Sequence, residues 1–368
     1  MFASHWMKSP RMPELAALPP VADGDGKGTG DEQRAQLPDF RTLQPIAGVA
    51  INAHHITYLD WYLDGVDKIA ELGGNALVLA TPMWMENVSS SEIRFLENRC
   101  PTDEQLAAIL TRAKQHGMTT MLLPVVLLEE AGERDWRGTI RPDDWDAWWK
   151  SYDAFLDRYI ALANRAKVDI LSIGSELNTT EPQVEHWQQT IKRVRSEYDG
   201  LLAYSANWDR YDQVTFWNDV DIMAVSSYFE LARDGSKPDL TVLVSAWNVE
   251  RDRLILAARR AGKPLLLSEV GYPSLPTAAM HPWNYSNTDG HKADHAAQAL
   301  CYRAFFESWL DVITQPRSTA LGFFCYAWDP YNHGGRDDTG YGITGKPSLE
   351  VIRRAFAKIR LRTTTSDR

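Results

Sequence analysis

Two glutamates stand at the ends of short apolar segments, and as a pair they suggest acid–base chemistry. Glu176 comes just after the apolar residues 169–174, and Glu269 follows residues 264–268. Two carboxyl groups in different surroundings can divide the hydrolysis of a glycosidic bond between them. One protonates the leaving oxygen, while the other stays ionised and attacks the anomeric carbon. A single glutamate at a strand end is as readily a structural carboxylate, paired with a loop amide or an arginine. Two in matching positions favour catalysis.

The adjacent histidines His54 and His55 raise the possibility of a metal site. Successive side chains of a strand point to opposite faces, so both histidines cannot face inward together. We therefore expect no metal and no other cofactor. We expect His54 to hydrogen-bond a substrate hydroxyl instead.

The chain is rich in aromatic residues, with 14 Trp, 14 Tyr and 11 Phe. Two interpretations of the tryptophans compete: wedges between helices, or platforms on which sugar rings stack. Tryptophans inside helical patterns favour wedges; these are Trp61, Trp145, Trp148, Trp149, Trp187, Trp247 and Trp309. Tryptophans that follow strands or lie in the loops beyond them favour platforms; these are Trp84, Trp136, Trp208, Trp283 and Trp328.

The strands and helices that must position these residues are visible in the sequence from about residue 45. Short apolar runs alternate there with longer amphipathic runs. The predicted strands are residues 46–53, 76–81, 119–126, 169–174, 202–205, 221–226, 264–268 and 321–327. The predicted helices are residues 58–72, 102–116, 142–166, 181–197, 240–261, 291–314 and 348–358. Most of these strands do not alternate apolar and polar residues. Parallel strands covered by helices also lack that alternation. Gly73, Gly117 and Gly262 follow predicted helix ends, where a left-handed cap is favoured.

Eight strands in strict alternation with seven helices predict the α/β class, as a (β/α)8 TIM barrel. The gap between the fifth and sixth strands is too short for a full helix. A doubly wound sheet is the alternative, but no glycine-rich phosphate turn follows the first strand. We expect one domain, with residues 41–362 as the barrel, residues 1–40 as a flexible N-terminal segment and residues 363–368 as a disordered tail.

The charge balance is acidic, with 49 Asp and Glu against 39 Lys and Arg, a net charge of −10. No stripe of basic residues interrupts it, so nucleic acid is not an expected partner. The longest apolar run, residues 117–128, is too short to span a membrane. Three cysteines are too few for a disulfide framework. The N-terminus lacks the pattern of a signal peptide, so we expect a cytoplasmic protein or a chain whose leader has been removed.

In such a barrel the active site forms at the C-terminal ends of the strands. The fourth and seventh strands face each other across the barrel, so Glu176 and Glu269 can converge on one bond. The residues expected to contact substrate lie at the same ends; they are His54, Trp84, Trp136, Arg137, Ser175, Asn178, Asn207, Trp208, Tyr228 and Trp328. We expect Arg137 either to bind sugar hydroxyls or to pair with Glu129 or Glu130.

Glutamates that end the fourth and seventh strands resemble the signature of the retaining glycoside hydrolases of clan A. Within that clan the chain most resembles glycoside hydrolase family 113, the β-mannanases, and their uncharacterised relatives. The resemblance covers roughly residues 45–360. The segments that carry it are residues 136–140, 145–152, 174–177, 206–208, 227–229 and 268–272, together with Trp328.

Applied position by position, the resemblance implies that Glu176 is the acid/base and Glu269 the nucleophile. It implies that Tyr228 supports the nucleophile's carboxylate and that Trp328 is the floor of the subsite for the reacting sugar. Many clan members have an asparagine where Ser175 stands, and it binds the sugar 2-hydroxyl. A water or Asn178 is therefore expected to make that contact here. The resemblance also implies an extracytoplasmic protein whose leader is missing from this chain.

We therefore expect a retaining β-glycoside hydrolase that acts by double displacement on a β-linked hexose oligo- or polysaccharide. A β-mannan is the first substrate to test, with β-glucan next. One alternative is a barrel that binds glycan without cleaving it, although binding alone needs neither glutamate. Another is a metal-dependent barrel hydrolase. The sequence leaves the sugar, the linkage, endo or exo action and the oligomeric state open.

Overall fold

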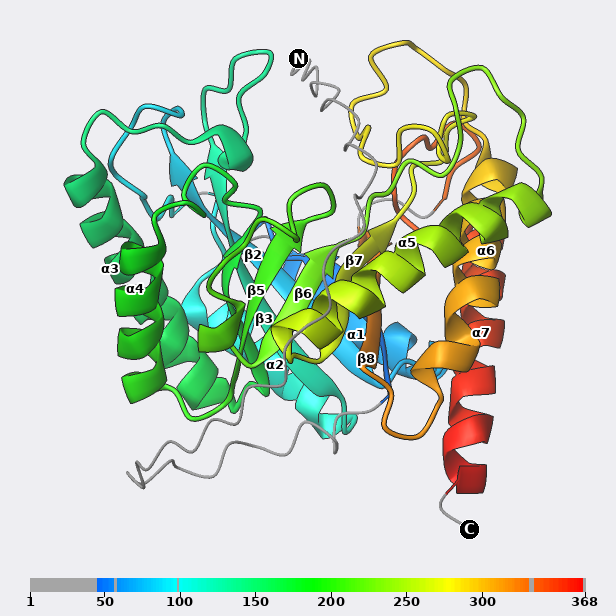
Figure 1. Ribbon diagram of the computed structural model, residues 1–368, viewed down its shortest axis with the longest axis horizontal. Coiled ribbons are helices and arrows are strands. Elements are labelled where there is room, and N and C mark those ends of the chain that lie inside the picture. Colours follow the sequence, from blue (N-terminus) through cyan, green and yellow to red (C-terminus); the bar gives the residue numbers. More distant parts are fainter. Residues whose placement is uncertain (1–44, 56–57, 98, 331–333, 367–368) are drawn as a thin grey trace, which may run out of the picture.

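Eight apolar segments form parallel strands that close into a barrel in sequence order, with β1 paired to both β2 and β8 (Figure 1). The computed structural model describes residues 45–55, 58–97, 99–330 and 334–366, with the backbone alone for residues 363–366. The strands are β1 (Ile46–Asn52), β2 (Ala76–Met85), β3 (Thr119–Leu128), β4 (Ile170–Ser175), β5 (Leu201–Asn207), β6 (Ile222–Ser226), β7 (Leu265–Gly271) and β8 (Ala320–Trp328). The predicted (β/α)8 TIM barrel is confirmed.

Helices follow the strands and surround the barrel. They are α1 (Leu59–Leu72), α2 (Asp103–Gln115), α3 (Trp145–Ala166), α4 (Val184–Glu197), α5 (Leu240–Ala261), α6 (His295–Ile313) and α7 (Pro347–Ser366), with the 3-10 turns η3 (Arg137–Thr139) and η4 (Trp217–Asp219). Between β5 and β6 the described chain holds η4 in place of a full helix, as the short gap predicted. The backbone of α7 continues to Ser366, whereas we expected a disordered tail from residue 363. The predicted flexible segment, residues 1–40, lies outside the described residues.

Local signals define the helix ends. The side chains of Asp144 and Asp239 accept hydrogen bonds from backbone N–H groups in the first turns of α3 and α5. Gly73 and Gly262 take left-handed conformations directly after α1 and α5, as predicted. These caps fix where each helix begins and ends, and with it where each strand-end loop starts.

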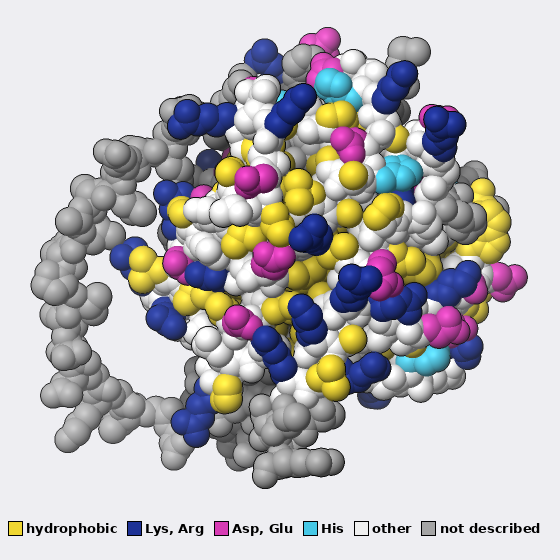
Figure 2. Space-filling model, turned by 90° about the vertical axis from the view of Figure 1, so that its right-hand side faces the viewer, with side chains coloured by type: hydrophobic (Ala, Val, Ile, Leu, Met, Phe, Trp, Pro, Cys, Tyr) yellow, Lys and Arg dark blue, Asp and Glu magenta, His cyan; other side chains and the backbone are white. Residues whose placement is uncertain are grey.

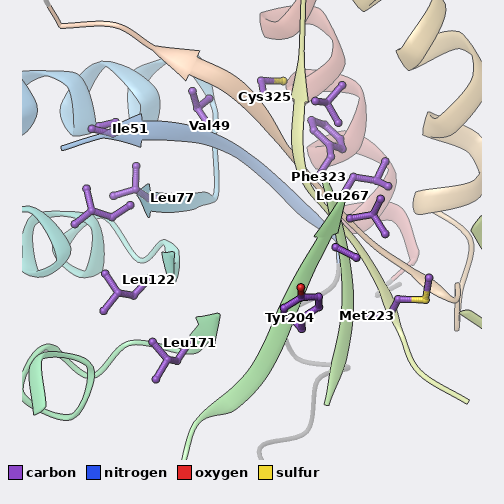
Figure 3. Packing of buried hydrophobic residues seen from close by; sticks show 14 of the residues in the cluster. Val49, Ile51, Leu77, Leu122, Leu171, Tyr204, Met223, Leu267, Phe323 and Cys325 are labelled. Carbon is purple, nitrogen blue, oxygen red and sulfur yellow. The ribbon is translucent and has the colours of Figure 1, made fainter. Parts of the chain in front are cut away.

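The core has two layers. Small and aliphatic side chains such as Ala50, Val78 and Ala224 fill the inside of the barrel. A larger layer lies between strands and helices, and part of it is drawn in Figure 3. The helical tryptophans lie mainly in or against this outer layer, and the fully buried ones are Trp148, Trp187, Trp247 and Trp309. The wedge interpretation was wrong for Trp61, which is 47% exposed.

The surface carries mixed charges. Figure 2 shows one face on which Lys and Arg side chains are interspersed with acidic ones. On α6 and α7 some of them form ion pairs, including Arg354 with Glu350. No helix in the described part of the chain is long and apolar enough to cross a membrane.

Candidate active site

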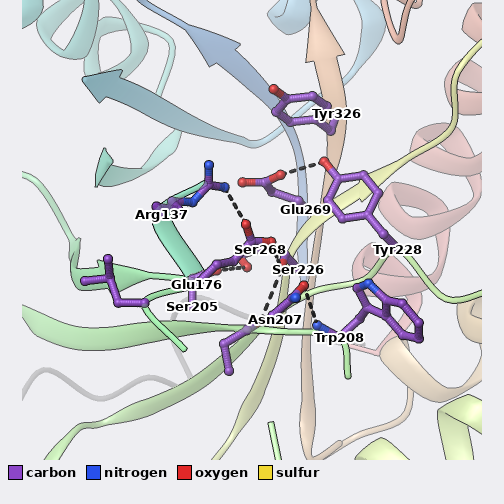
Figure 4. Close-up of polar contacts among 12 residues, drawn as sticks. Arg137, Glu176, Ser205, Asn207, Trp208, Ser226, Tyr228, Ser268, Glu269 and Tyr326 are labelled. Atoms are coloured by element: carbon purple, nitrogen blue, oxygen red, sulfur yellow. Dashed lines mark hydrogen bonds and ion pairs between the residues drawn. The ribbon is translucent and has the colours of Figure 1, made fainter. Parts of the chain in front are cut away.

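Glu176 and Glu269 lie at the C-terminal end of the barrel, where their side chains approach each other (Figure 4). Both are nearly buried, with exposed fractions of 4% and 6%. Buried carboxyl groups require donors or cations nearby, because burial disfavours the charged form. Each of the two has such partners, and they differ.

Glu176 is held by a cation and a hydroxyl. The Arg137 Nη2 donates to Glu176 Oε2 at 2.5 Å, and the Ser226 hydroxyl donates to Oε1. The backbone of Glu176 has a φ of 53°, in the left-handed region that few non-glycine residues adopt. Its own N–H donates to the Ser205 carbonyl at 2.8 Å. Glu176 thus has a cation on one carboxylate oxygen and a hydroxyl donor on the other.

Glu269 has the opposite environment. Burial raises its pKa to about 7, the negative charge of Glu176 adds to the rise, and Arg137 and the Tyr228 hydrogen bond oppose it. The Tyr228 hydroxyl donates to Glu269 Oε2 at 2.6 Å. Below about pH 7 Glu269 therefore holds a proton in the free protein.

Three tyrosines form a wall beside Glu269. The ring of Tyr228 lies 6.2 Å from that of Tyr326 and 6.0 Å from that of Tyr341, and all three rings are edge-on to one another. Asn52 of β1 donates to the Tyr326 hydroxyl at 2.6 Å. Sequence reasoning identified Tyr228 but missed Tyr326 and Tyr341 as members of the site.

A cleft of about 1320 Å³ opens between the loops that follow β3 to β7, and neither Glu176 nor Glu269 is among the residues that line it. Its lining includes four of the predicted substrate contacts, which are Trp136, Asn178, Asn207 and Trp208. Trp283 also lines the cleft, and its indole N–H donates to Glu230. Ser175 is buried next to Glu176, and its hydroxyl has no hydrogen-bond partner among the described residues.

Trp328 does not lie where we expected it. Its indole packs against α1, so closely that a Cβ on Gly65 would lie 2.9 Å from it, and it belongs to the outer core. A bulge explains the difference: Val49 pairs with Cys325 and Ile51 with Trp328, so two steps along β1 match three along β8. An extra residue reverses the alternation of the side chains that follow. Tyr326 therefore takes the position facing Glu269.

Other predicted residues lie apart from the glutamate pair or have other partners. Trp84 lies within β2 rather than after it, with Arg99 over its ring at 5.2 Å. Arg137 pairs with Glu176, not with Glu129, which pairs with Arg94. The expected pair of Arg137 with Glu129 or Glu130 was therefore wrong, and its contact with sugar hydroxyls stays a prediction.

His54 is half-buried near Arg137, and His55 is exposed. Burial, followed by the positive charges of His55 and Arg137, lowers the pKa of His54 to about 4. His54 is therefore neutral at neutral pH, with one ring nitrogen to donate and one to accept. Among the described residues, no group of three or more His, Cys, Asp or Glu side chains is arranged to hold a metal ion.

The family model of Glycoside Hydrolase Family 113 matches residues 62–346. A comparison with curated protein sequences found no match. Among solved structures, the chain is similar to a family 113 β-mannanase from Alicyclobacillus acidocaldarius at 27% identity and a TM-score of 0.76. That alignment covers 87% of this chain and 100% of the other.

Two further structures share the fold. One is a family 113 β-1,4-mannanase, with 22% identity, a TM-score of 0.75, and coverage of 85% of this chain and 99% of the other. The second is a family 5 mannosidase from Rhizomucor miehei, with 12% identity, a TM-score of 0.57, and coverage of 90% and 96%.

Proposed function

Because the chain belongs to glycoside hydrolase family 113, we propose that it hydrolyses a β-linked hexose polysaccharide, β-mannan first, with retention of anomeric configuration. The observation that supports this most strongly is the pair of buried carboxyl groups at the ends of β4 and β7. They are close enough for the charge of Glu176 to raise the pKa of Glu269. Two such groups on one bond are what double displacement requires.

In the first step, a Glu269 carboxylate oxygen forms a bond to the anomeric carbon while the bond to the leaving oxygen breaks. Glu176 gives its proton to that oxygen. In the second step, Glu176 takes a proton from water, and the water oxygen bonds to the anomeric carbon. The bond to Glu269 breaks, which restores both carboxyl groups. Tyr228 donates to Glu269 and orients it for attack.

This two-step reaction requires a proton on Glu176 when the sugar is bound. In the free protein, burial favours a proton on Glu269 instead. Arg137 is the group that can reverse this preference, because it is the cation held against Glu176. A sugar that draws the guanidinium away would leave Glu176 without its cation and able to take the proton. Substrate binding would thereby transfer the proton to the acid.

The cleft supports a polymeric substrate. Glu176 protonates the leaving group, so the leaving sugars must lie on the Glu176 side of the bond that is cleaved. The cleft begins close to that side, because Asn178, two residues after Glu176 in the chain, lines it. Trp136 and Trp208 offer aromatic faces there for sugar rings. The two family 113 structures described above are β-mannanases, which makes mannan the first substrate to test.

The test is product analysis by NMR on a panel of β-mannan, β-glucan and other β-linked hexans, with wild type and Glu269→Ala. We expect wild type to release β-anomers from mannan and the variant to release nothing. Initial release of α-anomers would refute retention. A glycan-binding barrel would be supported instead if neither protein turned over any glycan while both bound one. Turnover lost on treatment with a chelator would support a metal-dependent hydrolase.

A further inference from the structure

A buried hydrogen-bond chain lies behind Glu176, outside the substrate cleft. The N–H of Leu177 donates to the Tyr204 hydroxyl oxygen at 3.2 Å. That hydroxyl donates in turn to Glu181 Oε1 at 2.9 Å. Tyr204 is fully buried on β5, and Glu181 is 2% exposed in the loop between β4 and α4. Neither residue lines the substrate cleft, and Tyr204 belongs to the outer core layer.

The backbone at Glu176 needs such a chain. At Glu176 the main chain leaves β4 in a left-handed conformation, with a φ of 53°. The next N–H, that of Leu177, is buried and would otherwise lose its partner, which is costly. Gly174 makes room for the acceptor, because a Cβ there would lie 2.8 Å from the Tyr204 ring. The tyrosine oxygen thus takes the place of a strand partner.

The carboxyl group of Glu181, whose pKa is raised to about 7 by burial, determines which way the Tyr204 hydroxyl points. With Glu181 accepting the Tyr204 proton, the lone pairs of the phenol oxygen are available to the Leu177 N–H. The other Glu181 oxygen lies 3.7 Å from Arg210 Nε, and Arg210 lines the substrate cleft. A hydroxyl that accepts and donates at once fixes both of its neighbours.

We propose that Tyr204 and Glu181 are positioning residues for Glu176 as the general acid, acting through the Leu177 N–H. This inference rests on the proposed function. They hold the backbone directly after Glu176, and therefore the direction in which its carboxyl group points at the leaving oxygen. Their effect is confined to steps in which Glu176 transfers a proton.

Tyr204→Phe tests this on two aryl β-mannotriosides, one with a 4-nitrophenol and one with a 2,4-dinitrophenol leaving group. The quantity to measure is kcat/KM, which reports the first step. 2,4-Dinitrophenolate departs without a proton, whereas 4-nitrophenolate gains more from acid catalysis. We expect kcat/KM to fall about tenfold or more for the 4-nitrophenyl substrate and by less than about twofold for the other.

Tyr198→Phe is the matched control. Tyr198 is also buried, and its hydroxyl donates to the Val168 carbonyl at 2.8 Å, at the far end of the barrel. Both variants lose one phenol hydroxyl and its hydrogen bonds while keeping the ring. We expect Tyr198→Phe to leave the ratio of the two kcat/KM values as in wild type. A Tyr204→Phe variant that lowers both values equally, or neither, refutes the positioning role.

Glu181 provides a second test if Tyr204→Phe does not fold. Glu181→Leu removes the acceptor and should reproduce the selective loss, whereas Glu181→Gln keeps an acceptor oxygen and should recover most of it. Equal behaviour of these two variants refutes the proposal. Wild-type protein that cleaves neither aryl substrate nor mannan refutes the proposed function itself, before any variant is compared.

Discussion

Arg137→Gln is the substitution that tests the electrostatics of the carboxyl pair most directly. The guanidinium is 2.5 Å from Glu176 Oε2, with exposed side-chain fractions of 20% for Arg137 and 5% for Glu176. Its positive charge also lowers the pKa of Glu269. Removing this charge leaves two buried carboxyl groups with hydroxyl donors and no adjacent cation.

The expected magnitude follows from the distance. An opposite charge within 4–6 Å lowers the pKa of a carboxyl group by about 1–3. Loss of the cation therefore favours the protonated form of Glu269 and raises its pKa further, by up to about that amount. The acidic limb of the kcat/KM profile reports the ionisation that makes Glu269 a nucleophile. That limb should move to higher pH, and the optimum should become more alkaline.

The assay is the pH dependence of kcat/KM on an aryl β-mannotrioside at constant ionic strength. Arg141→Gln is the control, because Arg141 lies in the same loop, pairs with Asp135 and has a side chain that is 63% exposed. Its profile should match that of wild type. An Arg137→Gln profile that stays in place, or that moves to lower pH, would falsify the assignment of Arg137 as the cation that controls the pair.

Three further predictions concern stability and substrate contact. The folded protein binds more protons than the unfolded chain between the ordinary pKa of Glu269, 4.5, and its raised value of about 7, so stability falls as pH rises through that window. Glu269→Gln should therefore be more stable than wild type by about 3 kcal/mol at pH 8, and the difference should disappear near pH 4, as measured by urea unfolding. Lys346→Met removes the buried cation that lies 2.8 Å from Asp338, and it should lower the free energy of unfolding by about 3–5 kcal/mol. The double variant Lys346→Met/Asp338→Asn should recover much of that loss, because it leaves no unpaired buried charge. Trp328→Phe should lower the free energy of unfolding by about 1–3 kcal/mol without raising KM for manno-oligosaccharides. Tyr326→Ala should raise KM. A raised KM for Trp328→Phe and an unchanged KM for Tyr326→Ala would instead identify Trp328 as the sugar platform.

Most of the fold could be predicted from the sequence, because the local signals and the global structure agree. Strands buried on both faces need continuous apolar runs, and these runs were visible between residues 46 and 327. Helix ends were marked by glycines that later proved left-handed, such as Gly73 and Gly262. Glu176 and Glu269 could be chosen because the strand ends of a barrel form one surface.

The parts of the site that escaped prediction depend on contacts through space. The bulge in β8 is not encoded by any local turn residue, so the exchange of Trp328 for Tyr326 could not be foreseen. Arg137 had acidic neighbours in the sequence, and only the folded loop shows that it reaches Glu176. The contact between Tyr204 and Glu181 joins a strand to a loop 23 residues away. Its one trace in the sequence was a tyrosine between Ala203 and Ser205.

The hydrogen bond between Asn52 and Tyr326 joins residues that are 274 positions apart. It crosses the seam where the first strand meets the last, so during synthesis β1 emerges with one edge unpaired and stays so until β8 follows. A nascent chain that already contains both glutamates still has two open sheet edges and no tyrosine wall. Such edges pair readily with other chains. Truncation before β8 should therefore yield an aggregation-prone polypeptide rather than a weaker enzyme, and activity should first appear only after β8 has been synthesised.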